Sequence, residues 1–463
     1  MTDSIKTIQA KQRAFFQSGQ SKALSFRKTS LKALKTAINQ REKDIYVALK
    51  QDLGKSEFES YISEFSVVMA DIDQALSQLK HWSRPKRVTG SLLNFPSKDF
   101  IYKAPYGLTL HISPWNYPFQ LALAPLVAAV AAGNCVVLKP SEHSPNTSQL
   151  VENLISEVFN PGHVTVVQGD AQTAKTLLEL RWDYIFFTGS VAVGKIVAKA
   201  AAEYLTPVTL ELGGKNPCII DSSAALGLAA KRIVWGKFLN AGQTCIAPDY
   251  LLVHNTIYEP LIALLIKEIN AAFGNDPLQS PDYGRLIHRK HLDRQLALLD
   301  GETVICGGTY DLETNSLAPT LVEKPTMDSP VMKDEIFGPI LPILTYDIFA
   351  DIEHCLDQYA KPLGFYVFSK NKPFIEELIE RFGFGGGCVN DTMMQFVNSS
   401  LPFGGVGESG IGAYHGQFGF DTFSHQKAVS HRANWLDAPL RYAPYKNKLT
   451  QAKWVERLRA IFK

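Results

Sequence analysis

Hydrophobic residues in the first eighty positions recur at steps of three and four, with lysine and arginine between them. The clearest series are Leu31, Leu34 and Ile38, then Ile45 and Leu49. This period is typical of amphipathic helices, so we expect a helical N-terminal region. After Trp82 turn residues separate short extended pieces, and this pattern predicts a β-hairpin over 88–102.

Between residues 108 and 211 the pattern becomes a regular alternation of short β-rich runs and segments with helical spacing. The runs are 108–112, 135–138, 164–168, 184–187 and 208–211. Such an alternation implies right-handed βαβ crossovers and a parallel sheet. In such sheets ligands bind beyond the carboxyl ends of the strands, so we expect a cofactor crevice there. Polar or turn-forming residues follow three of the runs: Pro114-Trp115-Asn116, Lys139-Pro140-Ser141-Glu142 and Thr188-Gly189-Ser190.

A second α/β region extends from about 213 to 402, with further strands near 250–253 and 364–368. One apolar stretch, 121–138, has the length of a membrane span but contains proline, glycine and asparagine. These residues would leave backbone groups unpaired in lipid. We therefore expect a tightly packed helix that runs into a strand, and no transmembrane span.

Composition narrows the class of protein without identifying it. A chain of 463 residues is too long for one compact core, so two or three domains are expected. The formal net charge of +2 gives no reason to expect nucleic-acid binding, which usually needs a concentrated basic face. Scattered cysteines without a CxxC pair or nearby histidine ligands favour a reducing compartment and no metal. The N-terminus has no apolar signal-peptide core, so we expect a soluble, cytoplasmic protein.

Two loops of the first α/β region could hold a nucleotide. Gly189, Ser190 and Gly194 would place free N–H groups at the start of a helix, where the helix dipole favours a phosphate. The spacing is not GxGxxG, however, and paired glycines are common in ordinary strand–helix turns. Lys139 and Glu142 could hydrogen-bond the two hydroxyls of a ribose, or could occupy a solvated loop before a helix.

Three further residues could carry chemistry. Cys245 follows a polar Gly-Gln-Thr turn, although a buried structural cysteine is the commoner case and a reactive one needs donors or positive potential. Glu211 ends a β-rich run before paired glycines, which fits a positioned acid, a helix cap or a salt bridge. Asn116 could donate its amide to an oxyanion or could be a turn residue.

Taken together, these strings are far more specific than any one of them. Seven occur in order: Ser113-Pro-Trp-Asn116, Leu138-Lys-Pro-Ser-Glu142, Phe187-Thr-Gly-Ser190, Glu211-Leu-Gly-Gly-Lys215, Gly242-Gln-Thr-Cys245, Glu335-Ile-Phe-Gly-Pro339 and Pro402-Phe-Gly-Gly405. On them the chain resembles the aldehyde dehydrogenase superfamily from about residue 31 to 445. Further strings resemble its class 3 branch of fatty, aromatic and coniferyl-type enzymes: Asp52-Leu-Gly-Lys-Ser-Glu57, Cys245-Ile-Ala-Pro-Asp-Tyr250, Ser409-Gly-Ile-Gly412, Tyr414-His-Gly416 and Phe423-Ser-His425.

The resemblance implies NAD(P)-dependent oxidation of an aldehyde to the carboxylic acid. Cys245 would attack the carbonyl, Asn116 and the backbone N–H of Cys245 would hold the oxyanion, and Glu211 would activate the water that hydrolyses the thioester. Seven residues would contact the cofactor. They are Lys139 and Glu142 at the adenosine ribose, Gly189, Ser190 and Gly194 near the phosphates, Glu335 at the nicotinamide ribose, and Phe337 beside it.

The same resemblance also predicts which cofactor and which aldehydes the protein prefers. The Glu142 carboxylate at a 2′-hydroxyl should repel the extra phosphate of NADP, so we expect NAD to be preferred and NADP to be tolerated. Class 3 enzymes take medium or long aliphatic and aromatic aldehydes. Apolar residues are expected to shape the pocket here: Tyr117, Met393, Met394 and Phe396.

The resemblance also implies a domain plan. We expect a Rossmann-like parallel-sheet NAD(P)-binding domain, an α/β catalytic domain, and a small β arm that joins two copies into a homodimer through the hairpin and a strand near 429–436. The expected boundaries are 1–85 and 104–210, then 211–405, then 86–103 with 429–445 for the arm. A tail, 446–463, ends in a basic helix that could rest on an anionic membrane surface or, more commonly, pack against a subunit.

Two other functions stay open. A CoA-acylating or reductive aldehyde dehydrogenase would share the cysteine and the nucleotide domain. Glu211 favours hydrolysis instead, because a CoA-dependent enzyme needs no water-activating base. A non-catalytic structural relative would keep the fold without turnover.

Overall fold

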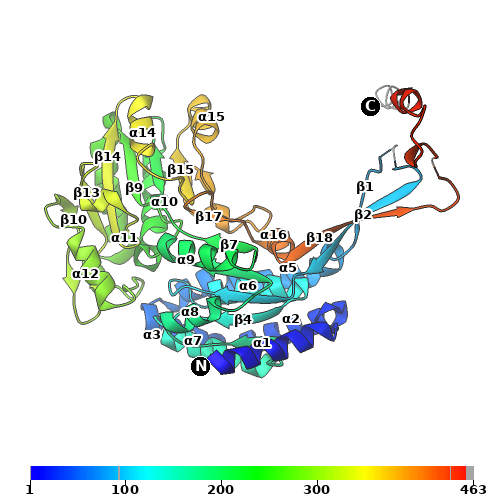
Figure 1. The fold of residues 1–463 in the computed structure, drawn as a ribbon. Coiled ribbons are helices and arrows are strands. Elements are labelled where there is room, and N and C mark those ends of the chain that lie inside the picture. Colours follow the sequence, from blue (N-terminus) through cyan, green and yellow to red (C-terminus); the bar gives the residue numbers. More distant parts are fainter. Residues whose placement is uncertain (1, 92–93, 438, 455–463) are drawn as a thin grey trace.

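The structure is a computed structural model that describes residues 2–91, 94–437 and 439–454 (Figure 1). Its N-terminal region is helical, as predicted, and includes one wide π-type turn over Tyr61–Phe65. The five helices are α1 (Thr2–Gln17), α2 (Leu24–Gln40), α3 (Glu42–Leu53), α4 (Glu57–Ser60) and α5 (Ser66–Trp82). The apolar series that predicted them, from Leu31 to Leu49, is fully buried.

A six-stranded sheet forms the first α/β unit. Its strands are β3 (Leu108–Ile112), β4 (Cys135–Lys139), β5 (Val164–Val166), β6 (Tyr184–Thr188), β7 (Val208–Glu211) and β17 (Gly410–Ile411). Their order is β17-β7-β6-β3-β4-β5, and all pairs are parallel except β17 with β7. The predicted parallel sheet is confirmed. Its connecting helices are α6 (Gln120–Ala132), α7 (Pro145–Val158), α8 (Ala171–Leu178) and α9 (Val191–Ala202).

Both faces of this sheet are covered, which explains why its strands are mostly apolar. Along β4, Val136 and Leu138 belong to the core that contains α2, α5 and α6, whereas Cys135 and Val137 belong to a core on the other face with Ile5 of α1. This alternation is the period-two geometry of a strand. The apolar stretch over 121–138 is therefore a buried helix and a central strand. Within the described residues no helix is both long and apolar enough to cross a membrane.

A seven-stranded sheet forms the second α/β unit, with order β10-β13-β14-β9-β8-β15-β16. All its pairs are parallel except β10 with β13. The strands are β8 (Pro217–Ile220), β9 (Tyr250–His254), β10 (Val304–Cys306), β13 (Thr320–Glu323), β14 (Ile340–Tyr346), β15 (Gly364–Phe368) and β16 (Gly386–Val389), beside the small pair β11 (Tyr310–Asp311) and β12 (Ser316–Leu317). Its helices are α10 (Leu226–Phe238), α11 (Tyr258–Phe273), α12 (Arg289–Ala297), α13 (Pro330–Lys333), α14 (Phe349–Leu356) and α15 (Lys372–Arg381).

A three-stranded antiparallel arm projects from the body of the molecule (Figure 1). The predicted hairpin is confirmed as β1 (Lys86–Val88) paired with β2 (Ser97–Pro105). The third strand, β18 (Ser424–Arg432), follows α16 (Gly416–Thr422) and pairs with β2 over its whole length. The strand expected near 429–436 therefore begins and ends earlier. Most of β18 is exposed, so no alternation of apolar residues marks its ends.

The chain crosses between the units more than once. After the second sheet it returns to the first, where Gly410 of β17 pairs with Glu211 of β7. The division into domains at 211 and 405 stays a prediction. Beyond the arm, a helix begins at residue 449. Leu458, Ile461 and Phe462 of the expected basic tail helix lie outside the described residues.

Candidate active site

The carboxyl edge of the six-stranded sheet gathers the expected polar residues. Asn116 follows β3, Lys139 ends β4, and Thr188 and Glu211 end β6 and β7 in direct register. Because β3 and β6 are neighbours whose connections lead to opposite ends of the sheet, a crevice opens between them. A cavity of about 330 Å³ lies there. Its wall includes Pro114, Trp115, Asn116, Thr188, Gly189, Ser190, Leu212, Gly213, Glu335 and Phe337.

Cys245 reaches this crevice from the second unit, on a loop before β9. Three consecutive residues before it, Asn240, Ala241 and Gly242, have φ values of 53°, 51° and 74°. Such left-handed conformations cost of order 1–3 kcal/mol each for residues with a side chain, and they concentrate at functional sites. Gly242 has a second constraint, since a Cβ there would overlap the carbonyl oxygen of Gly338.

Hydrogen bonds hold this strained loop against the first unit. The side-chain amide of Gln243 donates to the carbonyls of Asn240 and Arg285, each at 3.0 Å. Asn116 Nδ2 donates to the carbonyl of Gln243 at 3.0 Å, and Asn240 Nδ2 donates to the carbonyl of Asn116 at 2.7 Å. One amide hydrogen of Asn116 thus orients the side chain, and the second is available to a ligand.

A buried ion pair supports the Asn116 segment from behind. Lys55 Nζ lies 2.5 Å from Glu64 Oε1, and both side chains are inaccessible to solvent. Lys55 also donates to the carbonyl of Asn116 at 3.1 Å, while Glu64 accepts the N–H groups of Phe119 and Gln120. The sequence predicted no role for Lys55 or Glu64. Lys55 lies in the loop between α3 and α4 and Glu64 in the π-type turn, so no helical period relates the two residues.

Electrostatics at the site disfavour negative charge. Burial, and then the carboxylates of Glu335 and Glu211, raise the pKa of the Cys245 thiol. Burial also raises the pKa of Glu211 well above 4.5, and both of its oxygens lack a hydrogen-bond partner among the described residues. The backbone N–H groups of Cys245 and Ile246 favour the thiolate, but they do not outweigh burial and the two carboxylates. The alternative of a helix cap or salt bridge for Glu211 finds no support either.

A second cavity meets the first at these two residues. It measures about 270 Å³ and is walled mainly by apolar side chains. Thr188, Glu211 and Cys245 line both cavities. The second wall also includes all four residues expected to shape a substrate pocket: Tyr117, Met393, Met394 and Phe396. The site is thus a junction of the crevice, whose wall carries several polar groups, and a more apolar tunnel.

The loop that carries Glu335 and Phe337 is fixed by buried polar groups. Lys215 Nζ lies 2.7 Å from Asp249 and donates to the carbonyls of Val331 and Asp334. Asp249 in turn accepts the N–H of Ile336 at 3.0 Å. The Glu335 carboxyl projects into the crevice, where burial raises its pKa to about 8. Phe337, with φ of 50°, packs edge-on against Trp115.

The remaining predicted cofactor residues occupy the loops after β4 and β6. Lys139 Nζ lies 2.7 Å from Glu142 Oε2. Burial works to raise the pKa of Glu142, but the hydrogen bond and charge of Lys139 outweigh it and the pKa is lowered. Gly189 and Ser190 line the crevice, and Ser190 caps α9. Gly194 lies within α9, where a Cβ would come 2.7 Å from Leu212, so helix packing already requires a glycine there.

Comparison with known proteins agrees with this geometry. The model of the aldehyde dehydrogenase family matches residues 2–429. The chain belongs to the aldehyde dehydrogenase family. It is 45% identical to the 4,4'-diaponeurosporen-aldehyde dehydrogenase of Staphylococcus aureus over 95% of this chain and 96% of that protein. Mouse aldehyde dehydrogenase family 3 member B1 is 43% identical over 96% of each chain.

Two further likenesses bear on the site. The rat protein named aldehyde dehydrogenase, dimeric NADP-preferring, is 41% identical over 95% of this chain and 99% of its own. A solved structure of Staphylococcus aureus AldH in a substrate-bound state superposes with a TM-score of 0.95, at 44% identity and 99% coverage of both chains. The chain is therefore an aldehyde dehydrogenase like those of family 3, and it oxidises aldehydes with a nicotinamide cofactor.

Proposed function

We propose that Cys245 is the nucleophile that attacks the aldehyde carbon and carries the acyl group as a thioester. The observation that carries this proposal is the position of Cys245 at the junction of the two cavities. An aldehyde held in the apolar tunnel would present its polar end to the thiol, with the crevice beyond it. Neither cavity alone would bring the two substrates to the same sulfur atom.

The Asn116 amide and the Cys245 N–H would hold the oxyanion that forms when the thiol attacks. Support comes from the orientation of Asn116, whose amide is fixed by Gln243 and whose backbone is fixed by Lys55 and Asn240. A donor fixed before reaction does not have to reorganise during it, and losing one such donor typically costs about 3 kcal/mol of barrier. When bound, the nicotinamide cofactor would supply the hydride acceptor for this oxidation.

Glu211 would act as the general base of hydrolysis. It has no hydrogen-bond partner among the described groups, and burial raises its pKa, so its carboxylate is a stronger base than an exposed one. A water that gives its proton to Glu211 would attack the thioester carbon; the C–S bond then breaks and the acid leaves. An unpaired base in this place supports hydrolysis rather than transfer to CoA.

For the cofactor, we propose that Lys139 and Glu142 bind the adenosine ribose, that Gly189, Ser190 and Gly194 surround the phosphates, and that Glu335 and Phe337 contact the nicotinamide end. Glu142 is held ionised by Lys139, and this favours NAD over NADP because a 2′-phosphate would be repelled. The rat relative is named NADP-preferring, so tolerance of NADP is part of the proposal.

The tunnel supports a medium or long apolar aldehyde, aliphatic or aromatic, as substrate. Its wall is aromatic and sulfur-containing near Cys245, with few groups that could hydrogen-bond a polar chain. The Staphylococcus aureus relative is named for 4,4'-diaponeurosporen-aldehyde. A panel that increases in chain length and adds aromatic aldehydes would measure this preference through kcat/KM.

For assembly, we propose a homodimer formed through the projecting arm. Large apolar side chains are exposed on the arm and on the segment beyond it, including Val429, Trp435, Leu436 and Tyr445. Such a surface fits contact with a second copy, and it is also where the C-terminal tail would pack against a subunit or touch a membrane. All six cysteines are free, which supports function in a reducing compartment such as the cytoplasm.

The decisive experiment follows NADH absorbance with an aldehyde panel, with and without CoA, for the wild type, Cys245→Ala and Glu211→Gln. The alanine variant should lose turnover. The glutamine variant should give one burst of NADH per active site and then stop, with the acyl group trapped on Cys245. Product formation only in the presence of CoA would refute the hydrolytic role. A Cys245→Ala enzyme that keeps normal turnover would refute the nucleophile.

A further inference from the structure

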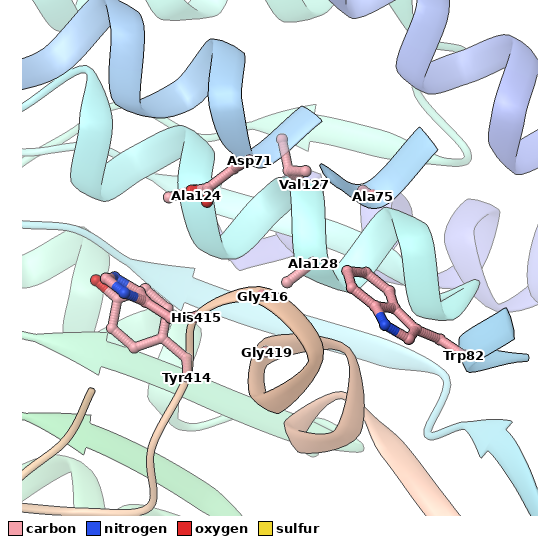
Figure 2. Close-up of a pocket in the computed structure, with 10 residues that line it drawn as sticks. All are labelled: Asp71, Ala75, Trp82, Ala124, Val127, Ala128, Tyr414, His415, Gly416 and Gly419. Carbon is pink, nitrogen blue, oxygen red and sulfur yellow. The ribbon is translucent and has the colours of Figure 1, made fainter. Parts of the chain in front are cut away.

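A small void lies behind the tunnel, between α5, α6 and the loop that leads into α16 (Figure 2). Its volume of about 20 Å³ is room for one water molecule, which needs roughly 10–15 Å³ and two to four polar partners. Three of its lining residues carry titratable groups: Asp71, Tyr414 and His415. Most of the others are apolar or small, such as Val127, Ala128 and Gly419.

Unsatisfied polar atoms surround this void. His415 Nε2 is buried without a hydrogen-bond partner in the described part of the chain. The Tyr414 hydroxyl has only the side-chain amide of Gln120 near it, and the two do not form a hydrogen bond of good geometry. Buried polar groups are normally satisfied, often by an internal water. The backbone is also strained here, since His415 has φ of 94°.

Tyr414 connects the void with the catalytic junction. Its side chain lines both the void and the apolar tunnel that holds Glu211 and Cys245. Burial raises the pKa of the Tyr414 hydroxyl, and the charges of Glu211, Cys245 and Asp71 raise it further. One hydroxyl is therefore within electrostatic reach of the proposed base on one side and of Asp71 on the other.

The reaction needs such a connection. Because the thiol is regenerated, each turnover releases two protons overall, both from the hydrolytic water. Glu211 must give up the proton that it accepts before the next cycle. Glu211 faces the crevice and the tunnel, which the cofactor and the acyl chain would fill during hydrolysis. The void on the other side of Tyr414 would stay free when both are occupied.

We propose that Tyr414, the water-sized void and Asp71 form a proton relay that returns Glu211 to its basic form after each hydrolysis. Once a side-chain rotation brings their oxygens into contact, Glu211 gives its proton to the Tyr414 oxygen while the Tyr414 hydroxyl proton passes to a water in the void. That water gives a proton to Asp71, and Asp71, which is half-buried on α5, releases it to solvent. No electrons move. This inference rests on the proposed hydrolytic role of Glu211.

Two features of the relay fit its task. Burial raises the pKa of Asp71 to about 7, so this carboxyl both accepts and releases protons near neutral pH. His415, the other titratable group at the void, has its pKa lowered to about 4 by burial, so it stays neutral and can hold the water without adding charge. Asp71 and Tyr414 would affect the reaction only through Glu211, by carrying away the proton that Glu211 accepts.

The test measures the decay of the acyl-enzyme directly. Enzyme, NAD and a limiting amount of a good aldehyde substrate are mixed and quenched in acid at set times, and the mass of the Cys245 peptide gives the acylated fraction. Asp71→Asn and Tyr414→Phe should each slow this decay at least fivefold. Asp71→Asn should leave the rate of NADH formation within twofold of the wild type. Asp71→Glu should restore the decay. Asp73→Asn, an exposed residue on the same helix that pairs with Lys35, is the control and should change nothing.

The pH profile separates proton transfer from structure. In the wild type the decay rate should rise with pH through about 7, because Asp71 must be ionised to accept a proton, and Asp71→Asn should lose that inflection. Unchanged decay and pH profile in Asp71→Asn would overturn the relay, and so would an equal loss of NADH formation. Glu211→Gln in the same assay keeps the two proposals apart. If it fails to trap the acyl group, the hydrolytic role fails; if it traps the acyl group and Asp71→Asn does not slow decay, only the relay fails.

Discussion

The carboxyl of Glu335 fits over the backbone of Gly213, in space that any side chain at that position would fill. A Cβ on Gly213 would lie 2.7 Å from the Glu335 carboxyl carbon, far inside van der Waals contact. Gly213 lies just before β8, and Glu335 lies just after α13. The glycine therefore places the carboxylate at the wall of the cofactor crevice.

Gly213→Ala should displace Glu335 and weaken cofactor binding with little loss of fold. We expect the KM for NAD to rise at least tenfold, since about 1.4 kcal/mol of lost binding corresponds to that factor. Gly227→Ala is the matched control, because a Cβ there meets nothing within 4 Å. A normal KM for NAD in Gly213→Ala would show that Glu335 does not bind the cofactor in this position.

Lys55→Met should destabilise the enzyme strongly. It leaves the Glu64 carboxylate fully buried beside the start of α6 without its cation, and breaking a buried pair from one side typically costs about 3–5 kcal/mol. Urea unfolding at pH 7 measures the loss. Lys35→Met, which breaks a partly exposed pair with Asp73, should cost less than about 1 kcal/mol. Equal losses in the two variants would contradict the prediction.

The six-stranded sheet was predictable from sequence because both its faces are buried. Its five parallel strands read as short β-rich runs, and the chain alternates run and helix between them. The sixth strand, β17, was not predicted, because it has two residues and joins the sheet only after the second unit. Strand β18 was misplaced because it lies exposed in the arm, where no core selects its residues. At the site, Cys245, Glu211 and Asn116 stood in recognisable strings. The shift in the pKa of Cys245 could not be predicted from these strings, because the carboxylate that contributes most to it after burial is Glu335, ninety positions away.

Glu59 should make the enzyme less stable at alkaline pH. Burial raises the pKa of Glu59 from 4.5 to about 7, so the folded state binds a proton that the unfolded chain releases. The contribution of protonated Glu59 to the free energy of unfolding is fully present below pH 4.5, and it is lost as the pH rises through about 7. A shift of this size corresponds to about 3 kcal/mol.

Glu59→Gln tests this dependence while keeping an oxygen that can accept the N–H of Asn240. The variant should raise the melting temperature at pH 8 and change it little at pH 5. Glu57→Gln, an exposed position on the same short helix, should be neutral at both values. A Glu59→Gln enzyme that is destabilised equally at pH 5 and pH 8 would show that packing, rather than ionisation, dominates at this position.

Glu142→Gln should change cofactor choice without changing the chemistry at Cys245. The neutral amide keeps a hydrogen-bonding group for the ribose but removes the charge that Lys139 holds ionised, so the 2′-phosphate of NADP is no longer repelled and Lys139 becomes free to pair with it. We expect the ratio of kcat/KM for NADP to that for NAD to rise about tenfold, with kcat for NAD within twofold of the wild type. An unchanged ratio, or a wild type that already prefers NADP by tenfold, would mean that Glu142 swings away from the bound nucleotide and does not select it.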